Sequence, residues 1–137
     1  MIAYDLDGVF ISDIKPFNNS LEYMLKARLE LAPNFIPNGL YSIITGRPES
    51  DKKDTERWVD KFLNENRPVY LFHDNPDFGN PHLYKLKVLK ENPSIMTFIE
   101  SDIGQVLFLR EELKDRDIKI IHFEELIKSS LERLQYE

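Results

Sequence analysis

Five short apolar runs that alternate with segments of helical spacing limit the folds open to this chain more than any other feature. They occupy residues 1–4, 40–45, 69–72, 95–99 and 118–123. Each run is too short for an ordinary helix and is bounded by turn-forming or polar residues, as a buried strand would be. Strands that alternate with helices build parallel sheets covered on both faces. We therefore expect an α/β protein with a three-layer, Rossmann-like fold around a mostly parallel five-stranded sheet.

The segments between these runs carry apolar residues at helical spacing. The expected helices cover residues 20–29, 48–63, 81–89, 106–113 and 126–134. Ser20 is suited to cap the first, and residues 74–79 are dense in turn formers. The 95–99 run is the most uniformly apolar, so we expect it at the centre of the sheet. The sequence shows no repeat and no linker, and residues 1–137 are expected to form one domain.

Composition excludes several classes of protein. Hydrophobic residues make up 42% of the chain, which argues against disorder, and the apolar runs are too short to cross a bilayer. No cysteine is present, so disulfides and thiolate metal sites are ruled out. The net charge of -6 argues against broad attraction to nucleic acid phosphates. With no secretory signal visible, we expect a soluble, cytoplasmic protein.

The first apolar run leads directly into two carboxylates in the sequence Asp5-Leu6-Asp7-Gly8-Val9. Alternate side chains of a strand share a face, so both acids can meet at the carboxyl end of the first strand, where open α/β sheets place their ligand crevice. Such a pair can hold a hard cation and keep one oxygen free to attack phosphorus. The alternative is an Asx turn without a chemical role.

Further polar residues follow other expected strands. Thr45 ends the second strand, Glu100 ends the fourth, and Lys85 is expected in the first turn of the helix that leads into the fourth. Because the carboxyl ends of parallel strands meet at one edge of a sheet, these side chains are expected to reach the crevice of the acid pair. Paired acids, a hydroxyl, a lysine and a second acidic cluster seldom occur in this order in an α/β domain by chance.

Four motifs follow one another along the chain. They are Asp5-Leu6-Asp7-Gly8-Val9, Thr45-Gly46-Arg47-Pro48, Lys85 and Phe98-Ile99-Glu100-Ser101-Asp102. Together they resemble the four motifs of the haloacid dehalogenase-like (HAD) phosphohydrolases over residues 2 to about 125, and the first motif is the most specific of them. The resemblance implies a HAD-like fold and a magnesium-dependent phosphomonoester hydrolase that acts through an aspartyl phosphate.

The resemblance also implies a role for individual residues. Asp5 would be the nucleophile and Asp7 the general acid and base. Thr45, with neighbouring backbone N–H groups such as that of Gly46, would hold a phosphoryl oxygen, and Lys85 would neutralise charge on the nucleophile. Mg²⁺ is the implied cofactor, bound through the Asp5 carboxylate, the Asp7 backbone carbonyl and an acid of the fourth motif.

The fourth motif departs from the family pattern, which commonly has Gly-Asp or two acids where this chain has Glu100-Ser101-Asp102. Ser101 falls at the usual ligand position, and we expect both Glu100 and Asp102 to contribute to the metal site, one of them directly. The departure leaves open weak metal binding or lost activity. Lys87 competes with Lys85 for the role of the motif lysine.

Arg47 and two histidines also lie near the motifs. Arg47 stands next to Thr45 and is a candidate substrate contact. His73 and His82 flank the turn-rich loop, and we interpret them as loop residues or rim contacts rather than as zinc ligands.

The intervals between the motifs leave no room for the cap domain that many HAD relatives insert, so the resemblance implies a capless, open site. Net acidity favours a small phosphorylated metabolite as the substrate, and a homo-oligomer could close the site. The alternatives are a phosphatase for a nucleic acid end or a phosphoprotein, a non-catalytic binding module, and a receiver-type phosphoacceptor domain, which the first two motifs fit poorly.

Overall fold

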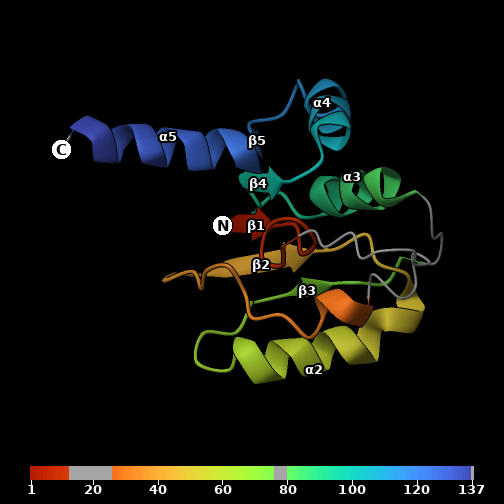
Figure 1. Ribbon diagram of the computed structural model, residues 1–137. Helices are drawn as coiled ribbons and strands as arrows, with labels where there is room; N and C mark the ends of the chain where they lie inside the picture. The colour runs from red at the N-terminus through yellow and green to blue at the C-terminus, as the bar shows by residue number, and fades with distance from the viewer. Residues whose placement is uncertain (13–25, 76–79, 137) are drawn as a thin grey trace, which may run out of the picture.

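The protein is built on a sheet of five strands that are all parallel (Figure 1). The computed structural model describes residues 1–12, 26–75 and 80–136. Its strands are β1 (Ile2–Tyr4), β2 (Tyr41–Ile44), β3 (Leu71–Phe72), β4 (Thr97–Glu100) and β5 (Lys119–His122). Each overlaps one of the apolar runs that predict it, which confirms the α/β, Rossmann-like expectation.

β1, rather than β4, occupies the middle of the sheet, whose order is β3-β2-β1-β4-β5. The prediction of a central 95–99 run is therefore wrong in detail, although β4 is an interior strand between β1 and β5. Apolarity cannot separate these two positions, because every interior strand is covered on both faces. The chain runs outward from β1 to β3 and then returns to β4, so the sheet has its topological switch point between β1 and β4.

The helices begin close to the residues that predict them. They are η1 (Glu49–Asp51), α2 (Lys52–Phe62), α3 (Pro81–Glu91), α4 (Ile103–Glu112) and α5 (Phe123–Tyr136). η1 follows Pro48 and leads into α2, while α3 starts at its own proline, whose missing N–H has no partner to lose in a first turn. Most of the helix expected at residues 20–29, with its cap Ser20, and residues 76–79 of the expected loop lie outside the described residues.

Two apolar clusters fill the space between the sheet and its helices. Ala3 and Phe98 face a cluster formed with α3 and α4, whereas Tyr41 and Ile43 face a second cluster formed with Trp58 of α2. Side chains of a strand alternate between faces, which is why neighbouring residues of β1 and β2 enter different clusters. Figure 1 shows α2 on one side of the sheet and α3 and α4 on the other.

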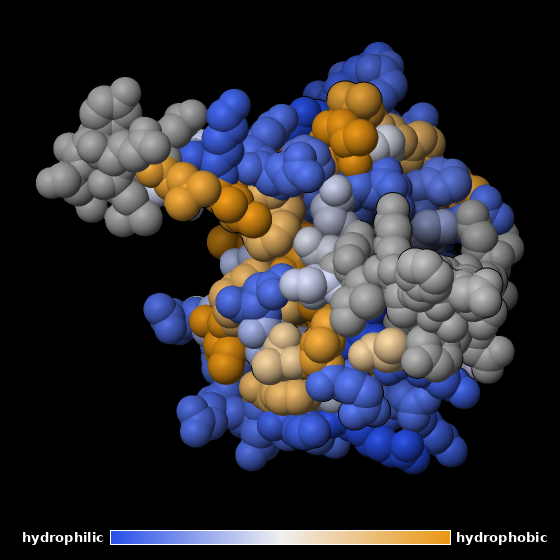
Figure 2. Space-filling view, viewed as in Figure 1, coloured by the Kyte–Doolittle hydropathy of each residue, from blue (hydrophilic) through white to orange (hydrophobic). Residues whose placement is uncertain are grey.

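α5 leaves the end of β5 and extends away from the sheet (Figure 1). Its side chains Leu126, Ile127 and Leu131 are exposed, and they border a groove of about 800 Å³ that Phe35 and Phe123 also line. Figure 2 shows these apolar residues of α5 facing a hollow beside the body of the protein. None of the helices in the described part of the chain is both long and apolar enough to traverse a lipid bilayer.

Candidate active site

The ends of β1 and β4 lie side by side at the switch point. The Asp5 N–H donates to the Ile99 carbonyl over 2.9 Å, which continues the pairing of the two strands one residue beyond β1. Glu100, the last residue of β4, therefore lies level with Asp5. Thr45 directly follows β2, the other neighbour of β1. The topology thus brings three of the residues predicted from the sequence to one edge of the sheet.

Lys85 joins the carboxylates of Asp5 and Glu100. Its Nζ lies 3.2 Å from Asp5 Oδ1 and donates to Glu100 Oε2 over 2.8 Å and to Gln105 Oε1 over 2.9 Å. The three charged residues are at most 4% exposed. Lys85 lies about one turn into α3, slightly further along the helix than expected, whereas the competing Lys87 is exposed. One buried ammonium group therefore faces two buried carboxylates.

Burial and this excess of carboxylates over ammonium groups shift the pKa values of Asp5 and Lys85. Burial, together with the nearby Glu100 carboxylate, raises the pKa of Asp5 well above its ordinary value of 3.8, and the Lys85 ammonium opposes the rise without cancelling it. Burial acts to lower the pKa of Lys85, but the two carboxylates outweigh it and raise that pKa. Lys85 is thus held in its protonated form, and Asp5 releases its proton at a higher pH than an ordinary aspartic acid does.

The raised pKa of Asp5 predicts a pH-dependent stability. A group whose pKa is higher in the folded protein stabilises it fully below the unfolded pKa, here 3.8, and that contribution is lost as the pH rises through the folded pKa. The raised pKa of Lys85 adds no pH dependence below its ordinary value of 10.5, because its contribution is fully present there and is lost only above that value. We expect the free energy of unfolding of the wild type to fall relative to that of Asp5→Asn as the pH rises above about 4. Urea unfolding of both proteins from pH 4 to 8 measures this difference, and parallel profiles would contradict it.

Ser101 joins the two oxygens that were expected to bind the cation. Its Oγ lies 3.0 Å from the Asp7 carbonyl oxygen and 3.3 Å from Asp5 Oδ2. His122 holds the same turn, since its Nε2 lies 3.0 Å from the Ser101 carbonyl oxygen. A carboxylate oxygen, a carbonyl oxygen and a hydroxyl oxygen therefore converge beside the switch point.

The two acids of the fourth motif face other partners. Glu100 pairs with Lys85 through Oε2 and accepts the Asp102 N–H through Oε1 over 3.2 Å. Asp102 is the N-cap of α4, where its Oδ1 accepts the Gln105 N–H over 2.9 Å. Within residues 1–12, 26–75 and 80–136, no three acidic or histidine side chains are grouped as a metal cluster. Of the fourth motif, Ser101 thus contacts both expected cation oxygens through its hydroxyl.

Asp7 is held on the turn that follows Asp5. Gly8 has a φ of 84°, a left-handed conformation that glycine adopts without strain, and its N–H donates to the Ile11 carbonyl over 2.7 Å. Both carboxylate oxygens of Asp7 accept from Arg47, Oδ2 from Nε over 2.9 Å and Oδ1 from Nη2 over 2.7 Å. Arg28 Nη1 lies 3.6 Å from the same Oδ1. The side chain of Asp7 is therefore fixed by guanidinium groups.

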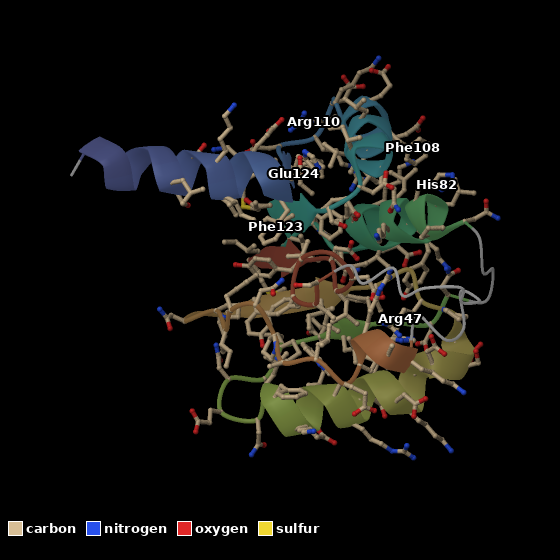
Figure 3. The ribbon with its side chains drawn as sticks, in the orientation of Figure 1. Arg47, His82, Phe108, Arg110, Phe123 and Glu124 are labelled. Carbon is tan, nitrogen blue, oxygen red and sulfur yellow. The ribbon has the colours of Figure 1, made fainter. Side chains whose placement is uncertain are left out.

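The segment after β2 is tied to the rest of the site. Thr45 is fully buried, and its Oγ1 accepts the Arg47 N–H over 3.2 Å. The Gly46 carbonyl accepts from Asn75 Nδ2 over 3.1 Å, and Gly46 lies against Pro81 at the start of α3. Figure 3 shows Arg47 beside η1. Thr45, Gly46 and Arg47 thus form one fixed loop that ends within reach of Asp7.

Gly46 is required here by a close approach. A Cβ at this position would clash with the Cβ of Pro81, and a ring carbon on a helix backbone cannot turn away. We expect Gly46→Ala to lower the free energy of unfolding by about 1–3 kcal/mol, as other forced overpacking does. Gly39→Ala is the matched control, since a Cβ there meets nothing within 4 Å. Chemical denaturation of both variants tests the difference, and equal stabilities would contradict the close packing.

Several residues of the site were missed by sequence reasoning. Arg28 reaches it from a distant segment, and no local pattern marks it. Gln105 reaches it from the first turn of α4, directly after the fourth motif. His73 is buried at the end of β3, where its Nε2 lies 2.8 Å from Thr55 Oγ1 and burial lowers its pKa. His82 instead packs edge-on against Phe108 of α4, as Figure 3 shows. The two histidines therefore have separate partners.

Comparisons of the chain with protein-family models, with curated proteins and with solved structures found no match. The family resemblance accordingly rests on the four sequence motifs.

Proposed function

We propose that this protein is a HAD-like phosphohydrolase without a cap domain, which hydrolyses a small phosphorylated metabolite through an aspartyl phosphate on Asp5. The observation that carries the proposal is the placement of Asp5. It is buried at the switch point of a parallel sheet, with one oxygen beside the Lys85 ammonium and the other beside the Ser101 hydroxyl. Open α/β sheets bind their ligands in that crevice.

In the proposed reaction a carboxylate oxygen of Asp5 attacks the phosphorus of a phosphomonoester. The bond to the leaving oxygen breaks, and that oxygen takes a proton from Asp7. Asp7 then takes a proton from water, whose oxygen attacks the aspartyl phosphate, so that inorganic phosphate leaves and Asp5 is restored. Lys85 Nζ, 3.2 Å from Asp5 Oδ1, lowers the repulsion between the nucleophile and an anionic substrate.

The residues present fit a hard divalent cation such as Mg²⁺. Asp5 Oδ2, the Asp7 carbonyl oxygen and Ser101 Oγ already converge, and oxygen is the ligand type that Mg²⁺ prefers. When bound, the cation would supply positive charge beside the phosphoryl group. Only one of these three oxygens is anionic, so we expect the cation to bind weakly. The other two acids have different partners, since Glu100 pairs with Lys85 and Asp102 caps α4.

The test is a hydrolysis screen over phosphorylated sugars, nucleotides, oligonucleotide ends and phosphopeptides, with Mg²⁺ varied. We expect Mg²⁺-dependent release of inorganic phosphate from at least one small substrate. A preference for phosphopeptides or oligonucleotide ends would replace the small substrate with a macromolecular one. Absence of hydrolysis in all groups would contradict the enzyme proposal.

A non-catalytic binding module is the second candidate, and the serine at position 101 favours it. A hydroxyl stands where an acid would give a stronger cation site, while Thr45 and Lys85, the residues proposed to contact a phosphate, both lie buried. This candidate predicts that phosphate binds without hydrolysis of any ester. The same screen, joined to a direct phosphate-binding measurement, separates the two candidates.

A further inference from the structure

Two arginines from separate parts of the chain meet at the side chain of Asp7. The Arg47 side chain is 1% exposed and donates to both oxygens of Asp7 in a two-bond pair, over 2.9 and 2.7 Å. Arg28 Nη1 lies 3.6 Å from one of these oxygens, and its side chain is 11% exposed. Arg47 Nη1 also lies 3.5 Å from Asp51 Oδ2. Asp7 thus supplies two of the acceptor oxygens of a largely buried guanidinium group.

This arrangement conflicts with the proton transfer that the proposed function assigns to Asp7. A carboxyl group that hands a proton to a leaving oxygen must turn one of its oxygens toward that atom. In the structure both oxygens are occupied by Arg47. Asp7 therefore has to exchange partners before it can act.

A phosphoryl group offers Arg47 the same kind of partner. Guanidinium groups bind phosphate, like carboxylate, through two parallel N–H···O bonds, and a phosphomonoester carries up to two negative charges. Arg47 is also close to the expected phosphate position, because its backbone N–H donates to Thr45 Oγ1 over 3.2 Å. A change of partner thus requires a movement of the Asp7 and Arg47 side chains, on the loops after β1 and β2, rather than a rearrangement of the fold.

We infer that the Asp7 carboxylate occupies the guanidinium site of the substrate's phosphoryl group, and that a phosphomonoester dianion displaces it from Arg47. Arg28 stands beside the same oxygen and completes the anion site. The exchange frees Asp7 for proton transfer only when a phosphoryl group is bound. It also selects doubly charged monoesters over singly charged diesters, because the incoming anion must compete with a carboxylate. This inference rests on the proposed function and names the ligand class of its site.

The test measures the dissociation constant of inorganic phosphate by calorimetry, in the presence of Mg²⁺. We expect Asp7→Asn to tighten phosphate binding about tenfold, the effect of removing one charge-assisted competitor. The tightening is expected to vanish in the Arg47→Gln background, because Asp7 acts through that guanidinium. Asp54→Asn removes an equal charge from a surface pair with Arg57 and is expected to leave phosphate binding unchanged. Tightening of equal size with and without Arg47, or no tightening at all, would overturn the inference.

A second readout keeps the test decisive if Arg47→Gln does not fold. The NMR signal of the Arg47 Nε–H in the wild type reports the bond to Asp7 directly. We expect saturating phosphate to shift that signal as the partner changes, and a signal that stays fixed while phosphate binds would overturn the exchange. Failure here would leave the proposed function intact if the wild type still hydrolyses a monoester and Asp5→Asn does not.

Discussion

Replacing Asp5 with Asn is expected to lower kcat for phosphomonoester hydrolysis by a factor on the order of 10⁴ or more, as loss of a nucleophile does in other enzymes. The amide has no anionic oxygen to attack phosphorus and cannot form the aspartyl phosphate. The fold should remain, because Lys85 keeps its bond to Glu100. We further expect the variant to be at least as stable as the wild type at neutral pH, since one of two crowded carboxylates is gone.

Steady-state kinetics and urea unfolding of the same preparations check both parts of this prediction. Asp54→Asn is the matched control, because it makes the same chemical change on the surface of α2. Hydrolysis by Asp5→Asn at the wild-type rate would remove Asp5 from the mechanism. Loss of both stability and hydrolysis would instead assign Asp5 a structural role.

Replacing Lys85 with Met is expected to give the largest loss of stability, about 3–5 kcal/mol in the free energy of unfolding. Met keeps the apolar length of the side chain but leaves the carboxylates of Asp5 and Glu100 buried without their cation. The loss should shrink at acid pH, where protonation of Asp5, whose pKa is raised, removes one of the buried charges. Denaturant unfolding at neutral and acid pH measures both effects.

Lys87→Met provides the control for this prediction. Lys87 lies on the same helix and is exposed, so its replacement is expected to change the free energy of unfolding by no more than about 0.5 kcal/mol. In the double variant Lys85→Met with Glu100→Gln, one carboxylate is removed, and part of the loss should be recovered. Equal stabilities of Lys85→Met and Lys87→Met would contradict the buried ion cluster.

The strands and the main site residues could be predicted because local patterns encode them. Each short apolar run contains one of the strands. Asp5 and Thr45, which follow β1 and β2, and Glu100, which ends β4, lie at one edge of the sheet because parallel strands share their direction. The position of β1 at the centre was not predicted, since it depends on where the chain returns across the sheet. The contact between Arg28 and Asp7 depends on the same long-range packing.

The placement of Asp102 could have been predicted from the sequence. Asp102 stands three residues before Gln105, and this spacing is the signature of a capped helix start. The structure shows that cap, with Asp102 Oδ1 accepting the Gln105 N–H. The family resemblance instead favoured Asp102 and Glu100 as cation ligands. A side chain whose spacing predicts a helix cap is therefore a weaker candidate for a cation ligand, because the cap already uses its oxygen.

The formation of a phosphoryl group on Asp5 is the central claim, and site-resolved mass spectrometry of an acid-quenched reaction tests it most directly. Asp7→Asn should be mixed with Mg²⁺ and an aryl phosphate, whose leaving group needs little protonation, so that the step that requires water activation becomes slow. We predict a phosphoryl group on the peptide that contains Asp5, and none when Asp5 is also replaced by Asn. The account would be contradicted if phosphate were released while neither the wild type nor Asp7→Asn carried that adduct. An adduct on another residue would contradict it as well.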